Sequence, residues 1–471
     1  MAIVRPLAPA PPNAAPPMAD LTRRMLQAPI AATVLGLAAP NVVVITVQSV
    51  VNVMEAVFVG WLGADALAGV ALVFPLVMLM QMMSAGGVGS GVASAVARAL
   101  GAGRRRDADA LVLHAVVIAA IFALVFTVGM LWGGPAIYRA MGGTGGALTA
   151  ALGYSNVIFA GAGAVWLFNI LAAVLRGAGH MTVLAVVVMG GSLAIVPLSA
   201  GLIWGWGPLP RLGIAGAALA LVIYHLAGAV VLGVMLLSGR SLTRLRVRGM
   251  TLCRAAFADI LRVAVPGALS TVQTNLTAVL VTAVVGGFGT MALAGYGMGA
   301  RLEYLQIPLV FGLGSALVTM VGTNIGAGQL RRARRIALVG AGLAFVMTEA
   351  IGLLAAIFPE KWLGLFTRDR EVILAGSQYL HVAGPSYGFF GAGVALYFAS
   401  LGAGRALWPL GAGFGRLVLA AGGSWLAVHW LGGGVAAISA AIAGAFAVHA
   451  LTLASVVGQR SWPAATQGDR R

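Results

Sequence analysis

Long apolar stretches, separated by short polar or basic segments, run through most of the chain. Each is about 20 residues or more, which is enough for a helix rising about 1.5 Å per residue to cross a bilayer. Lipid offers no partner for free backbone groups, so each stretch is expected to be helical. We place twelve such spans at about 30–59, 66–95, 108–132, 147–173, 182–205, 213–238, 258–285, 292–322, 336–358, 372–398, 406–430 and 434–457.

The first span carries a carboxyl group. In VNVMEAVFVGWLG (51–63), Glu55 lies within or at the edge of the hydrocarbon, where a charged side chain costs about 2.5–3.5 kcal/mol. Asn41, Gln48, Asn52 and Glu55 share one helical face by their spacing, because residues three, four or seven apart are neighbours on a helix. We expect this polar face to line a cavity. The alternative is a structural carboxyl group that is hydrogen-bonded within the helical bundle.

Composition excludes a soluble globular protein, because the mean hydropathy is +0.99 and only 9% of the residues are charged. The formal net charge of +17 comes mainly from arginines clustered between spans, so we interpret it as a topology signal and expect no nucleic-acid partner. The single cysteine, Cys253, excludes an intramolecular disulfide and a cysteine-rich metal site. No metal and no cofactor are expected.

The basic clusters follow the even-numbered spans. Arginines occur at 104–106, 176, 240–254, 331–335 and 405, and near both chain ends. The positive-inside rule therefore predicts that these connections and both termini are cytoplasmic, in a multi-pass protein of the cell inner membrane. Residues 1–29, which are rich in Pro and Ala, are expected to be a disordered cytoplasmic tail, and residues 458–471 a second tail.

Three blocks recur at one spacing. VGWLGADALAG (59–69) returns as VGGFGTMALAG (285–295), GAGRRRDA (101–108) as GAGQLRRA (326–333), and RGAGH (176–180) as LGAGR (401–405), which gives offsets of 225 or 226 residues (326 − 101 and 286 − 60). We predict an all-α membrane protein with two homologous six-helix lobes, 30–238 and 257–457, joined by a basic cytoplasmic linker at 239–256. An even number of spans per lobe predicts a pseudo-two-fold axis along the membrane normal, with a substrate cavity between the lobes.

These blocks, together with LRGAGH (175–180) and LGIAGAALA (212–220), resemble the multidrug and toxic compound extrusion (MATE) transporters over about residues 30–457. The resemblance implies a two-lobed antiporter that exports organic cations and amphipathic drugs and is driven by protons or sodium. It also implies that Glu55 is the counterpart of the acidic residue on the family's first helix. Loss of water around a carboxyl group favours its protonated form, so Glu55 could bind and release a proton during transport. We expect a monomer.

Protons are favoured over sodium. Members that resemble sodium binders carry a pattern like N-x-x-x-D-P on helix five, whereas this chain has Ser192 and Val196 at those positions. Sodium requires several oxygen ligands, so the loss of two weakens such a site while leaving a protonatable glutamate intact.

Further cavity or substrate-binding candidates lie on three other spans. They are Tyr154 and Asn169 on span four, Gln273 and Asn275 on span seven, and Arg301 and Glu303 on span eight. For each, interhelical hydrogen bonding is the structural alternative. Glu349 on span nine is a weaker coupling candidate.

Two other classes of protein were weighed. A lipid-linked precursor flippase of the same superfamily would share the two-lobed architecture, but it should carry arginines in its central cavity. An enzyme would require a nucleophile, base or metal constellation, and none is found. The GAG turns lack the Lys-Ser/Thr that follows in an NTP-binding loop, which disfavours ATP-driven transport.

Overall fold

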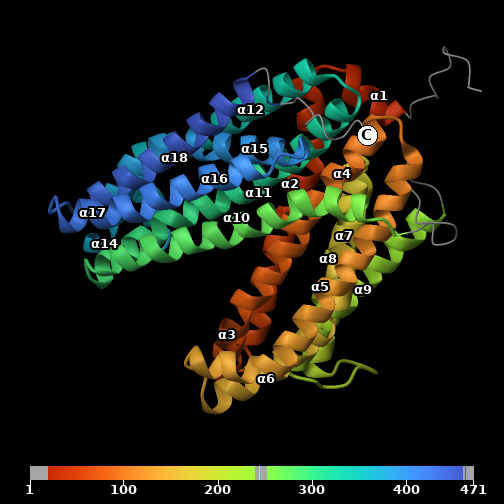
Figure 1. The fold of residues 1–471 in the computed structure, drawn as a ribbon. Coiled ribbons are helices and arrows are strands. Elements are labelled where there is room, and N and C mark those ends of the chain that lie inside the picture. The colour runs from red at the N-terminus through yellow and green to blue at the C-terminus, as the bar shows by residue number, and fades with distance from the viewer. Residues whose placement is uncertain (1–19, 239–242, 244–251, 460–461, 463–471) are drawn as a thin grey trace, which may run out of the picture.

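The computed structural model describes residues 20–238, 243, 252–459 and 462. Within these residues the chain forms two groups of helices and no β-strand (Figure 1). The linker predicted at 239–256 lies mostly outside the described residues, and so do most of the two predicted tails. The described part of the first tail is not disordered, because Asp20–Gln27 forms the short helix α1.

The first group of helices is the N-lobe. Its elements are α2 (Ile30–Gly60), α3 (Ala64–Gln81), the π-helix η1 (Met82–Val88), α4 (Gly89–Gly101), α5 (Arg105–Ala140), α6 (Gly145–Ala160), α7 (Ala162–Gly177), α8 (Met181–Trp204) and α9 (Ile214–Leu237).

The second group is the C-lobe. Its elements are α10 (Arg254–Gly286), α11 (Thr290–Gly326), α12 (Leu330–Ile357), α13 (Pro359–Leu363), α14 (Arg370–Ala383), the 3₁₀ turn η2 (Gly384–Ser386), α15 (Tyr387–Gly402), α16 (Leu407–Leu417), the π-helix η3 (Val418–Gly422), α17 (Gly423–His429) and α18 (Val435–Gly458).

These elements form twelve helical segments at the twelve predicted positions. Ten are long and apolar enough to cross a membrane, and α6 with α7 makes an eleventh that is bent by 50°. The remaining segment, α14–η2–α15, is broken at Gly384–Ser386, where Pro385 has no backbone N–H to continue the helix. The spans thus agree with the sequence, whereas the breaks within them were not predicted.

The two lobes repeat each other in detail. Gly69 lies against Ala147, Ala150 and Ala151 so closely that a Cβ would overlap them. Gly295 meets Val372, Ala375 and Gly376 in the same way, at positions shifted by the repeat offset. Both sites are contacts between the second and fourth helices of a lobe. The internal repeat is therefore a repeat in packing, which confirms two homologous six-helix lobes.

The second span differs between the lobes. The offset is 226 residues at Gly69 and Gly295 but 225 at Gly101 and Gly326, so the N-lobe has one additional residue between these points. The π-helix η1 lies in this interval, whereas the corresponding part of α11 is continuous α-helix. A π-turn closes i→i+5 hydrogen bonds and so accommodates an additional residue within a helix.

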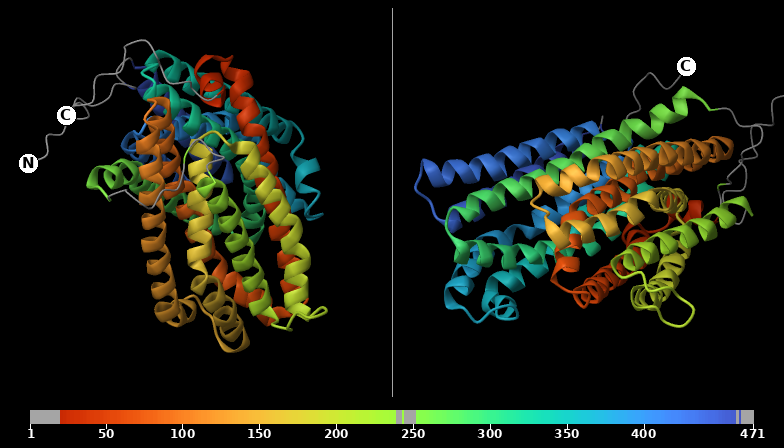
Figure 2. Two further views of the ribbon diagram at one scale, coloured as in Figure 1. Left: turned by 90° about the vertical axis from the view of Figure 1, so that its right-hand side faces the viewer. Right: turned by 90° about the horizontal axis from the view of Figure 1, so that it is seen from below.

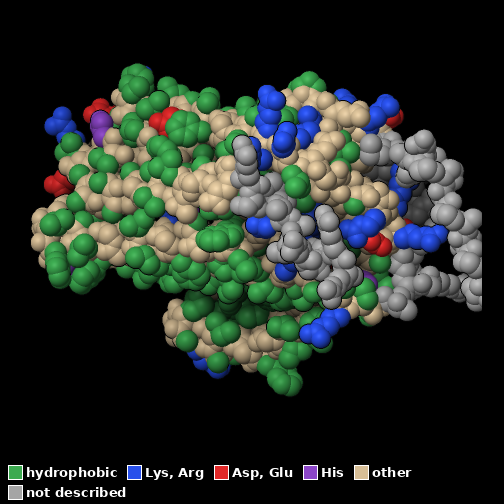
Figure 3. Space-filling model, turned by 45° about the horizontal axis from the view of Figure 1, so that its top comes forward, with side chains coloured by type: hydrophobic (Ala, Val, Ile, Leu, Met, Phe, Trp, Pro, Cys, Tyr) green, Lys and Arg blue, Asp and Glu red, His purple; other side chains and the backbone are tan. Residues whose placement is uncertain are grey.

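The lobes meet at one end and separate at the other. The connections 101–105, 177–181, 326–330 and 402–407 lie where the lobes meet, and we call this the closed end. Glycines there bring the backbones of α4 and α11 into contact. Toward the other, open end the two groups of helices diverge (Figure 1), and the orange to yellow-green N-lobe helices run side by side as one body (Figure 2, left). Figure 3 shows a hollow between the lobes along which hydrophobic side chains gather, and Lys and Arg side chains near the closed end.

Candidate functional site

Glu55 lies inside the N-lobe, near the open end of α2. The side chain is only partly exposed, and its Oε1 is buried without a hydrogen-bond partner among the described residues. The hydroxyl of the buried Tyr154, on α6, interacts with it electrostatically. A carboxyl oxygen buried without a partner is costly if it is charged, so this position suits a group that binds and releases a proton.

A second polar group lies further along α2. Gln48, two turns before Glu55 on α2, comes close to the hydroxyl of Tyr224 on α9, as does Ser192 on α8. The hydroxyl is buried and has no well-formed hydrogen bond to a described residue. Glu55 and Tyr154 thus lie near each other inside the N-lobe, and Gln48 lies near Tyr224, two turns away along α2.

The other polar residues of α2 point elsewhere. Asn41 is buried and its amide lies 3.3 Å from the Sδ of Met181 on α8. Asn52 is exposed. The predicted polar face therefore does not act as one unit, because Asn41 contacts Met181, Gln48 lies near Tyr224 and Asn52 is exposed.

Asn169 belongs to a separate buried network. Its amide donates to the Oε1 of Gln81 at 2.9 Å and to the Oγ of Ser84 at 2.8 Å. Gln81 Nε2 lies 3.3 Å from the Nε2 of His225, whose other ring nitrogen is 2.8 Å from the carbonyl of Leu221. The network joins α7 and α9 to the start of η1. Asn169 thus makes the interhelical hydrogen bonds that were the structural alternative for it, and its amide protons point into the lobe.

The C-lobe has its own carboxyl group. Glu303 on α11 accepts a hydrogen bond from the hydroxyl of the buried Tyr379 on α14. Tyr296 packs edge-on against Tyr379, with ring centroids 5.1 Å apart. Tyr379 occupies the position that corresponds to Tyr154 in the repeat. Each lobe therefore places a tyrosine from its fourth helix beside a carboxyl group, although the carboxyl groups come from non-equivalent helices.

A buried arginine that the sequence reasoning missed accompanies this pair. Arg416 on α16 interacts electrostatically with Glu303. It donates to the Oγ1 of Thr274 at 2.9 Å, and its Nε is buried without a partner among the described residues. Its sequence context, GFGRLVLA (413–420), is an ordinary apolar run that gives no sign of this contact.

The remaining predicted residues are dispersed. Gln273 is buried and donates to the carbonyl of Gly413 on α16, so it joins two helices of one lobe. Asn275 is exposed and its amide lies 4.0 Å from the Sδ of Met82 on η1 in the other lobe. Arg301 is exposed and its guanidinium lies 5.4 Å from the ring centroid of Phe366, in the connection at the open end. Of these three, only Asn275 reaches across the lobes.

Glu349 on α12 binds a helix end. Its Oε2 accepts from the backbone N–H of Gly388 at 2.6 Å, in the first turn of α15. The N–H groups of a first helical turn have no partner within the helix. Glu349 therefore compensates for the break in span ten, which is a structural role.

Together these features define a class of protein. Two homologous bundles of membrane-spanning helices enclose a cleft that is open at one end only, and each bundle carries a buried carboxyl group. Such a structure is typical of a secondary transporter with alternating access.

Comparisons with known proteins identify the family. The family model described as MatE matches residues 40–200 and again 266–426. The chain is 27% identical over 381 residues to a protein named FAD transporter from Shewanella oneidensis, covering 80% of this chain and 82% of the relative. It is 31% identical over 378 residues to a probable multidrug resistance protein NorM of Deinococcus radiodurans, covering 74% and 77%. A crystal structure of MATE in the bent conformation superposes with a TM-score of 0.87 at 23% identity, covering 94% of this chain and 98% of that one.

The chain therefore belongs to the MatE family of multidrug efflux transporters. The two matched segments have the same spacing as the internal repeat. Members of the family are transporters rather than enzymes, in agreement with the sequence analysis.

Proposed function

We propose that this protein exports organic cations and amphipathic drugs from the cytoplasm by antiport with protons. The observation that supports this most directly is Glu55, a carboxyl group inside the N-lobe with a buried oxygen that has no hydrogen-bond partner in the described part of the chain. Several relatives are named for multidrug resistance or export. We propose also that the protein acts as a monomer of two lobes in the cell inner membrane, with the arginine-rich closed end and both termini in the cytoplasm.

The proposed cycle uses the two ends of the cleft in turn. When the cleft is open outward, a proton from outside binds Glu55 and the substrate leaves. The lobes then close at the open end and separate at the closed end. Glu55 releases its proton to the cytoplasm, and a new substrate molecule binds. Tyr154, which lies near the carboxyl group, helps to position it.

Sodium remains the alternative coupling ion. Ser192 lies within the N-lobe polar group, but a hydroxyl is a poorer sodium ligand than a carboxylate. Replacement of an Asn and Asp pair by Ser192 and Val196 therefore favours a proton, whose binding requires only the one carboxyl group.

The test is substrate efflux from proteoliposomes under an imposed pH gradient or an imposed sodium gradient, with ethidium as the probe. The wild type should respond to the pH gradient, and Glu55→Gln should not. Glu360→Gln, at an exposed glutamate near the open end, is the matched control and should transport normally. Efflux driven only by sodium, or full pH-driven activity of Glu55→Gln, would overturn the proposal.

A second candidate substrate is a flavin dinucleotide. The relative with this name is 27% identical over 80% of the chain, and the buried guanidinium of Arg416, with its unpartnered Nε, could bind an anionic group. Loading the same vesicles with FAD tests this directly. FAD export that is lost in Arg416→Gln, with ethidium efflux intact, would favour it over drug export.

A further inference from the structure

The closed end is built around a crossing of α4 from the N-lobe and α11 from the C-lobe. A Cβ on Gly101 would lie 2.0 Å from the carbonyl oxygen of Thr323, and a Cβ on Gly326 would lie 2.0 Å from that of Arg98. These two contacts are exchanged by the repeat offset of 225. The pseudo-two-fold axis therefore passes between them.

Two hydrogen bonds across the lobes follow the same symmetry. The Oγ of Ser94 on α4 donates to the carbonyls of Leu401 and Gly402, at 2.5 and 3.1 Å, where α15 ends in the other lobe. The Oγ1 of Thr319 on α11 donates to the carbonyl of Arg176 at 2.8 Å, where α7 ends. In each lobe, one hydroxyl thus hydrogen-bonds to the end of a helix in the other lobe.

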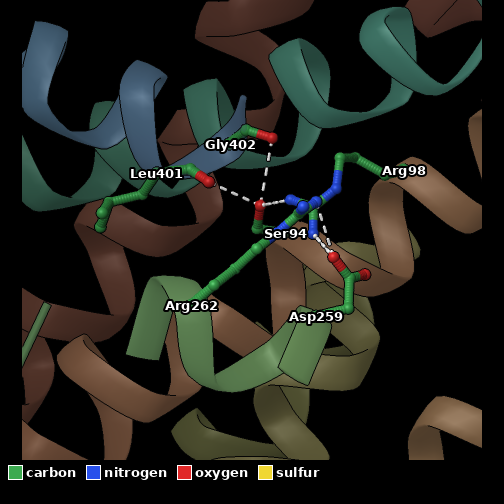
Figure 4. Close-up of polar contacts among 6 residues, drawn as sticks. All are labelled: Ser94, Arg98, Asp259, Arg262, Leu401 and Gly402. Carbon is green, nitrogen blue, oxygen red and sulfur yellow. Dashed lines mark hydrogen bonds and ion pairs between the residues drawn. The ribbon is translucent and has the colours of Figure 1, made fainter. Parts of the chain in front are cut away.

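An ionic contact is added on one side of the axis only. The guanidinium of Arg98, one turn after Ser94, donates to the Ser94 hydroxyl and to the Oδ1 of Asp259 on α10, the latter at 2.8 Å (Figure 4). Arg262, also on α10, lies 2.7 Å from the same Oδ1. The positions that correspond to Arg98 and Asp259 by the repeat are Thr323 and Thr33, which carry no charge.

The ion pair between Arg98 and Asp259 can form only when the two lobes are together at the closed end. The Arg98 side chain is 9% exposed and that of Asp259 is 31% exposed. They come from opposite lobes, so separation of the lobes at the closed end would break the pair and expose both charges to water. Removal of one partner while the lobes stay together leaves the other buried charge uncompensated, which is costly.

We infer that Arg98, Ser94 and Asp259 form a one-sided latch that holds the lobes together at the closed end and sets the ratio of outward-open to inward-open molecules. This inference rests on the alternating access of the proposed function. A contact present in one state only shifts the equilibrium by its own differential free energy. Arg98 and Asp259 are thus positioning residues, which act on the arrangement of the lobes and touch neither substrate nor proton.

The experiment measures the lobe arrangement directly, without substrate or gradient. Spin labels at Thr182→Cys on α8 and Leu407→Cys on α16, in a Cys253→Ser background, report the separation of the lobes near the closed end; both positions are exposed. Asp259→Asn should raise the population with a long label distance about tenfold over the latched protein. The matched control is Asp107→Asn, which breaks an exposed pair with Arg104 within one lobe and should leave the distances unchanged.

Two further variants separate the latch from a folding defect. Arg98→Lys keeps a charge beside Asp259 and should retain most of the short-distance population. Ser94→Ala removes the hydroxyl bonds to Leu401 and Gly402 without leaving a buried charge, and it should produce a smaller shift in the same direction. Unchanged distances in both Asp259→Asn and Ser94→Ala, or an equal shift in Asp107→Asn, would overturn the latch. Because the distances need no transport, they stand even if Glu55→Gln contradicts the proposed coupling.

Discussion

The two lobes differ in the groups that surround their carboxyl side chains. In the N-lobe, Tyr154 lies near Glu55, whose Oε1 has no hydrogen-bond partner among the described residues. In the C-lobe, the equivalent Tyr379 donates to Glu303, and Arg416 adds a positive charge nearby. The repeat conserves the tyrosine but supplies the carboxyl group from the lobe's first helix in one case and its second in the other. A carboxyl group held by a donor and a cation is suited to structure, whereas one without them is suited to exchange a proton.

The largest expected effect separates these two carboxyl groups. Glu55→Gln should abolish pH-driven efflux while leaving the unfolding temperature close to that of the wild type. Glu303→Gln should lower the free energy of unfolding by about 1–3 kcal/mol, because it weakens a buried, charge-assisted hydrogen bond, and it should keep pH-driven efflux. Efflux and thermal unfolding measured on both purified variants provide the comparison. Equal loss of coupling in both would show that the lobes are not specialised.

Substitutions at the crossing of α4 and α11, at the closed end, should have the next largest effect. Gly101→Ala places a methyl group against the Thr323 carbonyl, and overpacking of this kind costs about 1–3 kcal/mol. Thermal unfolding of the purified protein measures this cost. Gly163→Ala is the matched control, because nothing lies within 4 Å of a Cβ at that helical glycine. A control that destabilises as much as Gly101→Ala would contradict the role assigned to the crossing.

The paired tyrosines give an effect of similar size and a sharper contrast between the lobes. Tyr379→Phe removes the donor to Glu303 and should cost about 1.5–3 kcal/mol, as expected for a hydrogen bond to a charged group. Tyr154→Phe should cost less and should instead alter the pH dependence of efflux. If the two variants lost the same stability, the Glu55 and Glu303 sites would be energetically alike.

The smallest effect concerns the break in span ten. Glu349→Ala removes the acceptor of the Gly388 N–H and should cost about 1 kcal/mol, similar to the loss of a helix cap. Efflux per folded molecule should not change. A selective loss of pH-driven efflux at unchanged stability would instead give Glu349 a part in coupling.

Much of the fold could be predicted because periodicity and repetition are properties of the sequence. The twelve spans and the two halves follow from apolar length, arginine placement and the internal repeat, whereas the role of Glu55 stays a prediction. Tyr379 could also have been found, since it lies at the repeat offset from Tyr154. Asn52 and Asn169 show the limit, because shared helical spacing does not determine which neighbouring helix each side chain meets.

Other features could not be predicted from one sequence. Arg98 and Asp259 are 161 residues apart, and no local pattern connects them. Arg416 lies in an apolar run whose partners come from α10 and α11. Such contacts depend on how the lobes and helices pack, which spacing along the chain does not encode.

The π-helix η1 also bears on how the two lobes diverged after duplication. Across it the offset between the lobes changes from 226 to 225, which is a difference of one residue. That residue was therefore gained in one copy, or lost from the other, after an ancestral half-length gene had doubled. The asymmetry between the lobes thus includes a change that followed the duplication, and a deletion of one residue within 82–88 would make the interval from Gly69 to Gly101 equal to that from Gly295 to Gly326.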